Sequence, residues 1–328
     1  MRLKLTILLL NLFSVILATR PITYVYKTVD NLQILLDVYV PSKSSFSKYP
    51  VIFATHGGGY LLGTKSGAFS EQELNEILRR GWVAVSIDYR LSPGVFLDQI
   101  IEDCQDTYNW VRTELIKYVP IDPDRIAVFG GSAGGGLAVL NGYKLSPRPK
   151  AVISFYPFCT NFTDPYSYVP NTPVDESLVA QADKLRQNIS EYEVTGADDP
   201  RFALFFAALT QGKAGWLFTT KNPNESPSQI LSKLRELSAV ENIDSNYPPT
   251  YLIHGLKDSL VPYSQSVQMA DRLKKFNIIH KIDLVPDAEH GFDLQKVTTK
   301  MWKNHILPIF DFIQEHMVGY LEDKKIEV

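Results

Sequence analysis

The fold is indicated most clearly by the segment Arg125-Ile126-Ala127-Val128-Phe129-Gly130-Gly131-Ser132-Ala133-Gly134-Gly135-Gly136. Its first half is an apolar run, typical of a strand buried on both faces, and an Ala/Leu/Val-rich helical pattern follows. G-x-S-x-G, from Gly130 to Gly134, joins the two. A strand-to-helix turn this tight needs small residues two positions before and after the serine. The stretch therefore predicts a sharp turn that exposes the Ser132 hydroxyl beside a helix N-terminus, where negative charge is favoured.

A glycine-rich turn of this kind could instead bind a dinucleotide or a phosphate. G-x-G-x-x-G cannot be fitted here, because the position two after Gly130 is Ser132, and no G-x-x-x-x-G-K occurs in the chain. We therefore interpret the turn as one that holds a nucleophile.

The rest of the chain alternates short β-rich runs with helical patterns, which indicates an α/β protein. The eight predicted strands are residues 24–29, 32–39, 51–55, 82–87, 126–129, 151–155, 250–253 and 281–285. The first two flank Asp30-Asn31, a dipeptide typical of hairpin turns. Later runs such as Val-Ala-Val-Ser-Ile have the continuous apolar character of parallel strands. We expect a mostly parallel, eight-stranded sheet flanked by helices and opened by an antiparallel hairpin.

One long interval breaks this alternation. Between Phe155 and Thr250 there is no clear strand, and the stretch is rich in Pro, Asn, Ser and aromatic residues, with one apolar helical piece at 202–209. We interpret it as a cap insertion at about 160–246 within a single domain, residues 19–328.

A second glycine motif, His56-Gly57-Gly58-Gly59-Tyr60, directly follows the strand predicted at 51–55. Acyl transfer passes through a tetrahedral oxyanion, which needs preorganised N–H donors. Strand–loop motifs of this type supply such donors together with the residue after the nucleophile. We predict the amides of Gly58, Gly59 and Ala133 as the oxyanion hole, and a structural role for His56.

The general base and its orienting acid should lie in loops that follow later strands. His290 stands in the loop after the strand at 281–285, and Asp258 in the loop after the strand at 250–253. The chain order Ser132, Asp258, His290 is the order Ser…Asp…His. The acid would hold the imidazole tautomer and stabilise the imidazolium. Asp283, Asp287 and Asp293 remain alternative acids.

Five motifs in this order carry a resemblance to a known family: H-G-G-G-Y at 56–60, D-Y-R-L-S-P at 88–93, G-G-S-A-G-G at 130–135, H-G-x-x-D-x-x-V-P at 254–262 and E-H-G-F at 289–292. The sequence resembles the hormone-sensitive-lipase-like branch (fold-3) of the α/β-hydrolases. The resemblance implies a carboxylic-ester hydrolase without cofactor or metal. It also implies Ser132 as nucleophile, Asp258 and His290 as its partners, and Gly58, Gly59 and Ala133 as the hole.

The sequence departs from that family at two positions. Members commonly carry an acidic residue just before the nucleophile and a Glu after D-Y-R-L-x-P, where this chain has Gly131 and Gly94. Both positions lie near the expected acyl or alcohol pocket, so the substrate preference of better-known members does not transfer directly.

We expect a Ser-His-Asp hydrolase that forms an acyl-enzyme on a small to medium apolar ester. An amidase or formamidase, for example one like arylformamidase, would use the same triad. A peptidase of the prolyl-oligopeptidase type would need a domain ahead of the sheet, and few residues precede Tyr24. A ligand-binding homologue typically loses the catalytic histidine, whereas His290 is present.

Composition limits the other function classes. The 33 Lys and Arg residues nearly balance the 36 Asp and Glu residues, giving a net charge of −3, which gives no basic footprint for nucleic acid. Two cysteines, Cys104 and Cys159, cannot form a disulfide framework or a structural zinc site, although they could pair with each other. The expected partner is a small-molecule ester, and the sequence does not indicate an oligomeric state.

The N-terminus predicts the compartment. Arg2 and Lys4 precede an apolar run of about a dozen residues that ends before Ala18, the pattern of a secretory signal peptide at 1–18. The run is short for a stable membrane span, and an uncleaved anchor is the alternative. Sequons at Asn161, Asn188 and Asn224 agree with a secreted glycoprotein or a protein of the secretory lumen.

Overall fold

The computed structural model describes residues 20–170, 173–186, 199–222 and 224–319. The predicted signal peptide, residues 1–18, and the sequon at Asn188 lie outside the described residues. Among those described, no helix combines the length and the apolar character that a membrane span requires.

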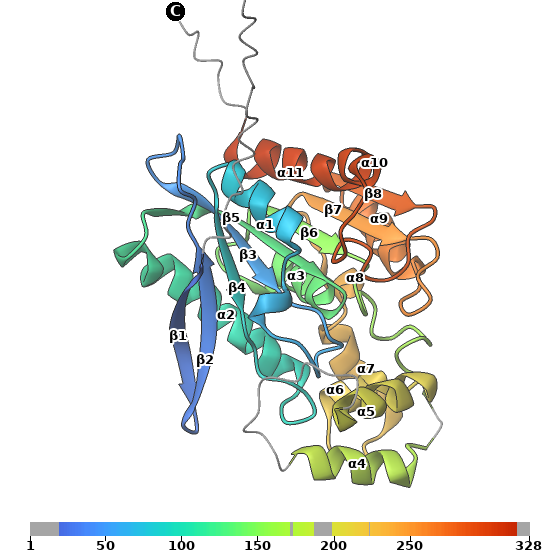
Figure 1. The fold of residues 1–328 in the computed structure, drawn as a ribbon. Coiled ribbons are helices and arrows are strands. Elements are labelled where there is room, and N and C mark those ends of the chain that lie inside the picture. The colour runs from blue at the N-terminus through green and yellow to red at the C-terminus, as the bar shows by residue number, and fades with distance from the viewer. Residues whose placement is uncertain (1–19, 171–172, 187–198, 223, 320–328) are drawn as a thin grey trace, which may run out of the picture.

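A single eight-stranded sheet forms the centre of the molecule, in the order β1-β2-β4-β3-β5-β6-β7-β8 (Figure 1). The pairs β1·β2 and β2·β4 are antiparallel, and all other neighbours are parallel. The strands are β1 Ile22–Val29, β2 Leu32–Tyr39, β3 Tyr49–Thr55, β4 Val83–Ile87, β5 Ile121–Gly131, β6 Ala151–Phe155, β7 Thr250–Gly255 and β8 His280–Val285. The predicted α/β fold with a mostly parallel sheet is confirmed.

Local sequence accounts for the shape of individual strands. Asp30 and Asn31 both have positive φ, +46° and +69°, as a two-residue hairpin turn requires. Every residue of β4 and β6 is buried, which explains their continuous apolar sequences. Strand β5 begins five residues earlier than the predicted start at Ile126, because its first part, around Pro123, is polar and partly exposed and has no strand-like pattern.

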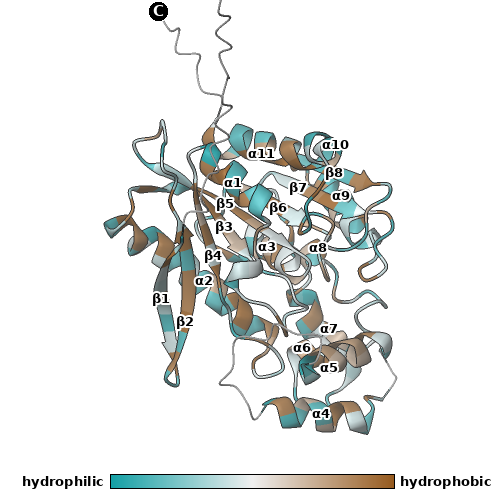
Figure 2. Cartoon of the chain, viewed as in Figure 1, coloured by the Kyte–Doolittle hydropathy of each residue, from teal (hydrophilic) through white to brown (hydrophobic). Residues whose placement is uncertain are grey.

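Alternate side chains of the strands enter two hydrophobic layers, one on each face of the sheet. Val51 and Phe53 of β3 point to the layer covered by α2, α3 and α9, whereas Ile52 and Ala54 point to the layer covered by α1 and α11. Figure 2 shows the central strands as predominantly hydrophobic. The covering helices are α1 Glu71–Arg79, α2 Leu97–Thr113, α3 Ala133–Lys144, α9 Ser264–Lys275, α10 Thr299–Met301 and α11 Leu307–Ile313, with short helical turns η1 Lys65–Gly67, η2 Leu115–Lys117, η3 Trp302–Ile306 and η4 Gln314–Val318.

The interval between β6 and β7 folds into helices whose buried apolar residues join the hydrophobic layer that α2, α3 and α9 cover. They are α4 Glu176–Arg186, α5 Pro200–Thr210, α6 Ala214–Thr219, α7 Pro227–Glu236 and α8 Ala239–Asn242. In Figure 1, α4 to α7 form a group at the bottom of the view, below the central strands of the sheet. The predicted apolar piece at 202–209 lies within α5. That the insertion acts as a cap stays a prediction.

Candidate active site

Ser132 stands on a sharp turn between β5 and α3. Its backbone has φ +57° and ψ −123°, a sparsely populated conformation of the kind that clusters at functional sites. The turn tolerates no side chain at its flanks: a Cβ on Gly130 would lie 2.3 Å from the Gly134 carbonyl oxygen, and one on Gly134 would lie 2.1 Å from that of Thr55. The small residues on both sides of Ser132 are therefore a steric requirement of this turn.

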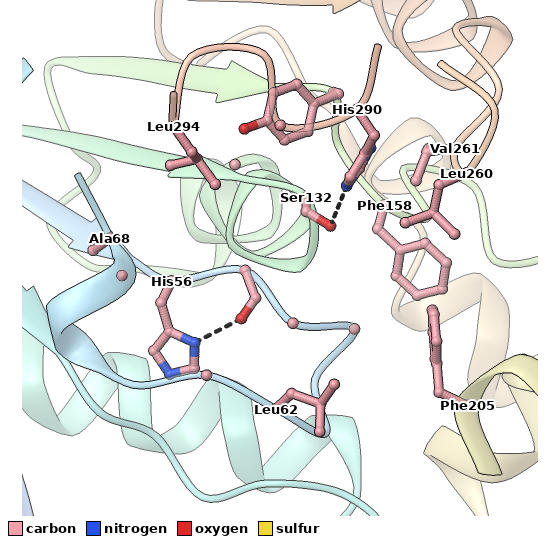
Figure 3. Close-up of a pocket in the computed structure, with 18 of the residues that line it drawn as sticks. His56, Leu62, Ala68, Ser132, Phe158, Phe205, Leu260, Val261, His290 and Leu294 are labelled. Atoms are coloured by element: carbon pink, nitrogen blue, oxygen red, sulfur yellow. Dashed lines mark hydrogen bonds between the residues drawn. The ribbon is translucent and has the colours of Figure 1, made fainter. Parts of the chain in front are cut away.

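The structure brings Ser132, His290 and Asp258 together in one hydrogen-bonded chain. His290 Nε2 lies 3.0 Å from Ser132 Oγ, as the dashed line in Figure 3 marks, and His290 Nδ1 lies 2.7 Å from Asp258 Oδ2. Because a carboxylate only accepts, Nδ1 carries the proton and Nε2 is left to accept from the serine hydroxyl. The arrangement has the order of contacts that activates a serine nucleophile.

Asp258 is held as a buried carboxylate. Its Oδ1 accepts hydrogen bonds from the amides of Leu260, at 2.9 Å, and Val261, at 2.7 Å. His254 Nε2 lies 3.2 Å from Oδ2, next to the bond from His290. Burial favours the protonated acid, but the hydrogen bonds from His254, His290 and Val261 outweigh it and hold the pKa of Asp258 well below its usual range. Asp258 is thus ionised at neutral pH.

Each alternative acid is engaged elsewhere. Asp283 accepts from His305 Nδ1 at 2.8 Å, Asp287 pairs with Lys257 at 2.8 Å, and Asp293 accepts from the hydroxyl of Tyr156. None of the three forms a hydrogen bond to His290, whose Nδ1 is bonded to Asp258.

His254 is a site residue that we did not predict. Its ring is fully buried, its Nδ1 lies 2.8 Å from Ser266 Oγ, and its Nε2 lies 3.0 Å from the Val261 carbonyl oxygen as well as near Asp258. The ring therefore fixes the loop that carries Asp258. The sequence signal that could have identified His254 is its position at the end of a strand, four residues before Asp258.

Residues 56–60, which carry two of the predicted oxyanion donors and which we call the oxyanion loop, turn tightly beside Ser132. Gly58 and Gly59 have φ of +109° and +62°, and a Cβ on Gly58 would lie 2.2 Å from the Leu62 carbonyl oxygen. Within the described part of the chain, neither glycine N–H has a backbone hydrogen-bond partner. Ala133 is the first residue of α3, where an N–H has no partner inside the helix. The three amides remain the predicted donors of the oxyanion hole.

His56 holds this loop in place through contacts with Gly57 and Tyr89. Its Nδ1 donates to the Gly57 carbonyl oxygen at 2.7 Å, and its ring stacks on Tyr89 with centroids 4.2 Å apart. The Tyr89 hydroxyl donates to the His56 carbonyl oxygen at 2.8 Å. Burial lowers the pKa of His56 to about 4, so the ring is neutral at pH 7. These contacts agree with the structural role expected for His56.

A cavity of about 490 Å³ opens beside Ser132. On one side lies a group of apolar side chains that we call the aromatic lobe: Phe158, Phe202, Phe205, Phe206 and Leu260. Figure 3 shows Phe158, Phe205 and Leu260 on one side of Ser132, with His56, Ala68 and Leu294 on the other. Helix α5 of the insertion supplies three of the phenylalanines. Sequence reasoning identified the helix but found no motif that would place these rings at the site.

Outside the cavity, the structure describes the two cysteines and the sequon residue Asn161. Cys104 and Cys159 are separate, buried free thiols and do not pair. The Asn161 amide is partly buried and donates to Gln268 at 3.0 Å. In the part of the chain that the structure describes, no group of three or more His, Cys, Asp or Glu side chains has a metal-binding arrangement.

Known proteins resemble this chain in sequence and in fold. The BD-FAE family model matches residues 36–168, and the prolyl oligopeptidase family model matches residues 203–319. A butyrate-bound esterase from Thermogutta terrifontis superposes with a TM-score of 0.63 at 21% identity, covering 93% of this chain and 96% of that one. The chain belongs to the α/β-hydrolase superfamily.

A second structure similar to this α/β-hydrolase is an acetyl ester-xyloside bifunctional hydrolase from Caldicellulosiruptor lactoaceticus. It has a TM-score of 0.61 and 23% identity, with 90% of this chain and 98% of that one covered. Curated relatives include 5-methylorsellinic acid synthase of Aspergillus terreus, 28% identical over 89% of this chain, and the non-reducing polyketide synthase ascC of Acremonium egyptiacum, 29% identical over 92%. The chain spans only 13% and 15% of those two proteins.

Proposed function

We propose that this α/β-hydrolase is a carboxylic-ester hydrolase of the hormone-sensitive-lipase-like branch, and that it acts through an acyl-enzyme on Ser132. The observation that carries the proposal is the 3.0 Å contact between Ser132 Oγ and His290 Nε2, on a ring anchored by the ionised Asp258. Ser132, His290 and Asp258 are then the catalytic residues, and the amides of Gly58, Gly59 and Ala133 form the oxyanion hole.

In the first step, Ser132 Oγ attacks the ester carbonyl carbon while its proton passes to His290 Nε2. Asp258 stabilises the imidazolium that forms, and the amides of the oxyanion hole stabilise the negative oxygen of the tetrahedral intermediate. The intermediate collapses as the bond to the alcohol oxygen breaks, and His290 gives its proton to that oxygen. The alcohol leaves, and the acyl group stays on Ser132.

In the second step, His290 takes a proton from a water molecule, whose oxygen attacks the acyl carbon. The second tetrahedral intermediate uses the same oxyanion donors. It collapses when His290 protonates Ser132 Oγ, which releases the acid and restores the free enzyme. No further group is needed to balance the reaction.

The aromatic lobe supports a small to medium apolar acyl or alcohol group as the substrate part bound there. Phe158 and Phe205 pack edge to face, with centroids 5.4 Å apart, and Leu260 lies beside them, so the wall offers apolar surface and no charge. The butyrate bound to the Thermogutta terrifontis esterase supports the same size range for this chain.

Other acyl donors share this chemistry. An amidase or formamidase would use the same three side chains, and we favour the ester because the structural neighbours include an esterase and an acetyl ester hydrolase. One curated relative is named for an aromatic acid, 5-methylorsellinic acid, so we also include an ester and a thioester of an aromatic acid as candidates.

The test is a substrate panel with wild type and Ser132→Ala. p-Nitrophenyl acetate, butyrate and octanoate probe chain length, p-nitrophenyl benzoate and a benzoyl thioester probe an aromatic acyl group, and an anilide and N-formylkynurenine probe amide cleavage. We expect Ser132-dependent hydrolysis of the esters, with little amide cleavage. Preferential hydrolysis of the anilide or formamide would contradict the ester assignment.

We further propose that residues 1–18 are a cleaved signal peptide and that the protein is secreted or resides in the secretory lumen. N-terminal sequencing of protein from the culture medium of a eukaryotic host should begin at Thr19. Retention in the membrane fraction with an intact N-terminus would support the uncleaved anchor instead.

A further inference from the structure

Tyr156 is a buried residue with a strained backbone conformation, and its side chain lies next to Gly131, the residue before the candidate nucleophile. It follows β6 with φ +34°, in the left-handed region that bulky residues rarely occupy, and only 1% of its surface is exposed. Its N–H donates to the Ile253 carbonyl oxygen of β7 at 2.7 Å. Strain of this kind persists only where surrounding contacts fix it, and it concentrates at functional sites.

The contacts of the Tyr156 ring lead to the catalytic base. Its centroid lies 4.6 Å from that of His290, and 6.4 Å from that of His254 in an edge-to-face arrangement. Its hydroxyl donates to Asp293 Oδ1. The phenol thus lies between the His290 imidazole and a second buried carboxyl group.

Gly131 makes room for this arrangement. A Cβ at position 131 would lie 3.0 Å from the Tyr156 hydroxyl oxygen and 3.2 Å from the ring, so a larger side chain there would displace the phenol. Gly131 is one of the two positions at which the sequence departs from the family it resembles. In this chain the residue before the nucleophile is therefore a glycine. A buried acid from another segment, Asp293, binds the phenol that lies next to it.

Asp293 interacts with a second buried carboxyl group, that of Glu73. Asp293 is 4% exposed and Glu73 of α1 is 1% exposed, and the two interact. Burial and the charge of Asp293 raise the pKa of Glu73 well above its usual range. Burial also raises the pKa of Asp293, to about 6, against the hydrogen bond from Tyr156 and the field of His290. The hydrogen bond from the Tyr156 hydroxyl favours the ionised form of Asp293.

We propose that Tyr156 and Asp293 form a second arm that positions His290 and stabilises its protonated form, in addition to Asp258. The hydrogen bond to a carboxylate makes the phenol ring more electron-rich, and a cation within about 6 Å of such a ring centroid is attracted to it. That attraction grows when His290 accepts the Ser132 proton. No proton leaves Tyr156, and the inference rests on the proposed function, because it concerns the same base.

The test compares Tyr156→Phe, which keeps the ring and removes the hydroxyl, with Asp293→Asn, which keeps an acceptor and removes the charge. Both variants and their double variant are assayed for kcat and KM on p-nitrophenyl butyrate. Because the arm acts on charge that develops after binding, we expect kcat to fall about tenfold in each, with KM changed by less than about twofold. The double variant should lose no more than either single one, since both remove one linked interaction.

Tyr247→Phe is the matched control. Its hydroxyl is also buried and donates to a backbone carbonyl of α3, that of Val139 at 2.6 Å, and not to a residue of the triad. It should keep the wild-type kcat even if its melting temperature falls. Should Tyr156→Phe fail to fold, Asp293→Asn carries the test alone.

Labelling of Ser132 by a fluorophosphonate gives a second readout that does not depend on the ester chosen. We expect the rate constant of labelling to fall about tenfold in Tyr156→Phe and Asp293→Asn, and to stay unchanged in Tyr247→Phe. If folded Tyr156→Phe and Asp293→Asn keep the kcat and the labelling rate of wild type, or if only their KM rises, the inference is overturned. The proposed ester hydrolase function is not affected by either result. A wild-type protein that neither hydrolyses esters nor becomes labelled would overturn the proposed function itself.

Discussion

His290 Nε2 lies 3.0 Å from Ser132 Oγ, although 158 positions separate the two residues in the chain. The order of the parallel strands explains the contact. Ser132 follows β5, Asp258 follows β7 and His290 follows β8, and these strands lie close together in the sheet. Because parallel strands end at one edge, the three loops converge there.

The Asp258 carboxylate orients His290, and replacing it with an amide tests that role. Asp258→Asn keeps the shape of the side chain, but its nitrogen cannot accept the Nδ1–H of His290 and favours the wrong tautomer. We expect kcat for p-nitrophenyl butyrate to fall by about four orders of magnitude, with little change in KM. An Asp258→Asn protein with wild-type kcat would show that another residue orients the base.

The backbone of the oxyanion loop leaves no room at Gly58. Gly58→Ala would place a Cβ 2.2 Å from the Leu62 carbonyl oxygen at a φ of +109°, so the loop must shift and its amides must move. We expect a loss in kcat of about a hundredfold or more. Gly67→Ala is the control, since a Cβ there meets no heavy atom within 4 Å. Equal kcat values for the two variants would argue against the loop as the oxyanion hole.

The side chain of Phe205 limits the size of the aromatic lobe. It packs on Phe158, and its ring would lie 2.9 Å from a Cβ placed on Gly59. Phe205→Ala removes this wall, and we expect kcat/KM for p-nitrophenyl octanoate relative to the acetate to rise about tenfold. An unchanged ratio would place the acyl chain on the other side of Ser132.

The buried neutral His56 should make stability depend on pH. Its folded pKa of about 4 lies below the unfolded value of about 6.5, so the unfolded chain binds more protons between these values. The contribution of His56 to the free energy of unfolding is therefore complete above pH 6.5 and is lost as the pH falls towards 4, by about 3 kcal/mol. Urea unfolding of wild type and His56→Asn at several pH values measures it. If His56→Asn shows the same pH dependence as wild type, another group is responsible.

The sequence was informative wherever a pattern is local. The eight strands follow from apolar runs and turn dipeptides, and the nucleophile turn follows from steric needs at Gly130 and Gly134. The extra length of β5 was missed because the residues around Pro123 are polar and partly exposed.

The parts of the site that were not predicted depend on contacts between distant segments. Tyr156 meets Asp293 across 137 positions, and neither belongs to a motif that implies the other. Phe205 reaches the oxyanion loop from a helix whose periodicity indicates only an apolar face. Local patterns define elements and motifs, whereas the walls of the cavity follow from tertiary packing.

The most direct test of the central claim is the rate of p-nitrophenyl butyrate hydrolysis by wild type and Ser132→Ala at equal concentration. We expect turnover by wild type and a loss of at least about four orders of magnitude in Ser132→Ala, with an unchanged melting temperature. Hydrolysis by Ser132→Ala at a rate near that of wild type would contradict the claim that Ser132 carries the acyl group.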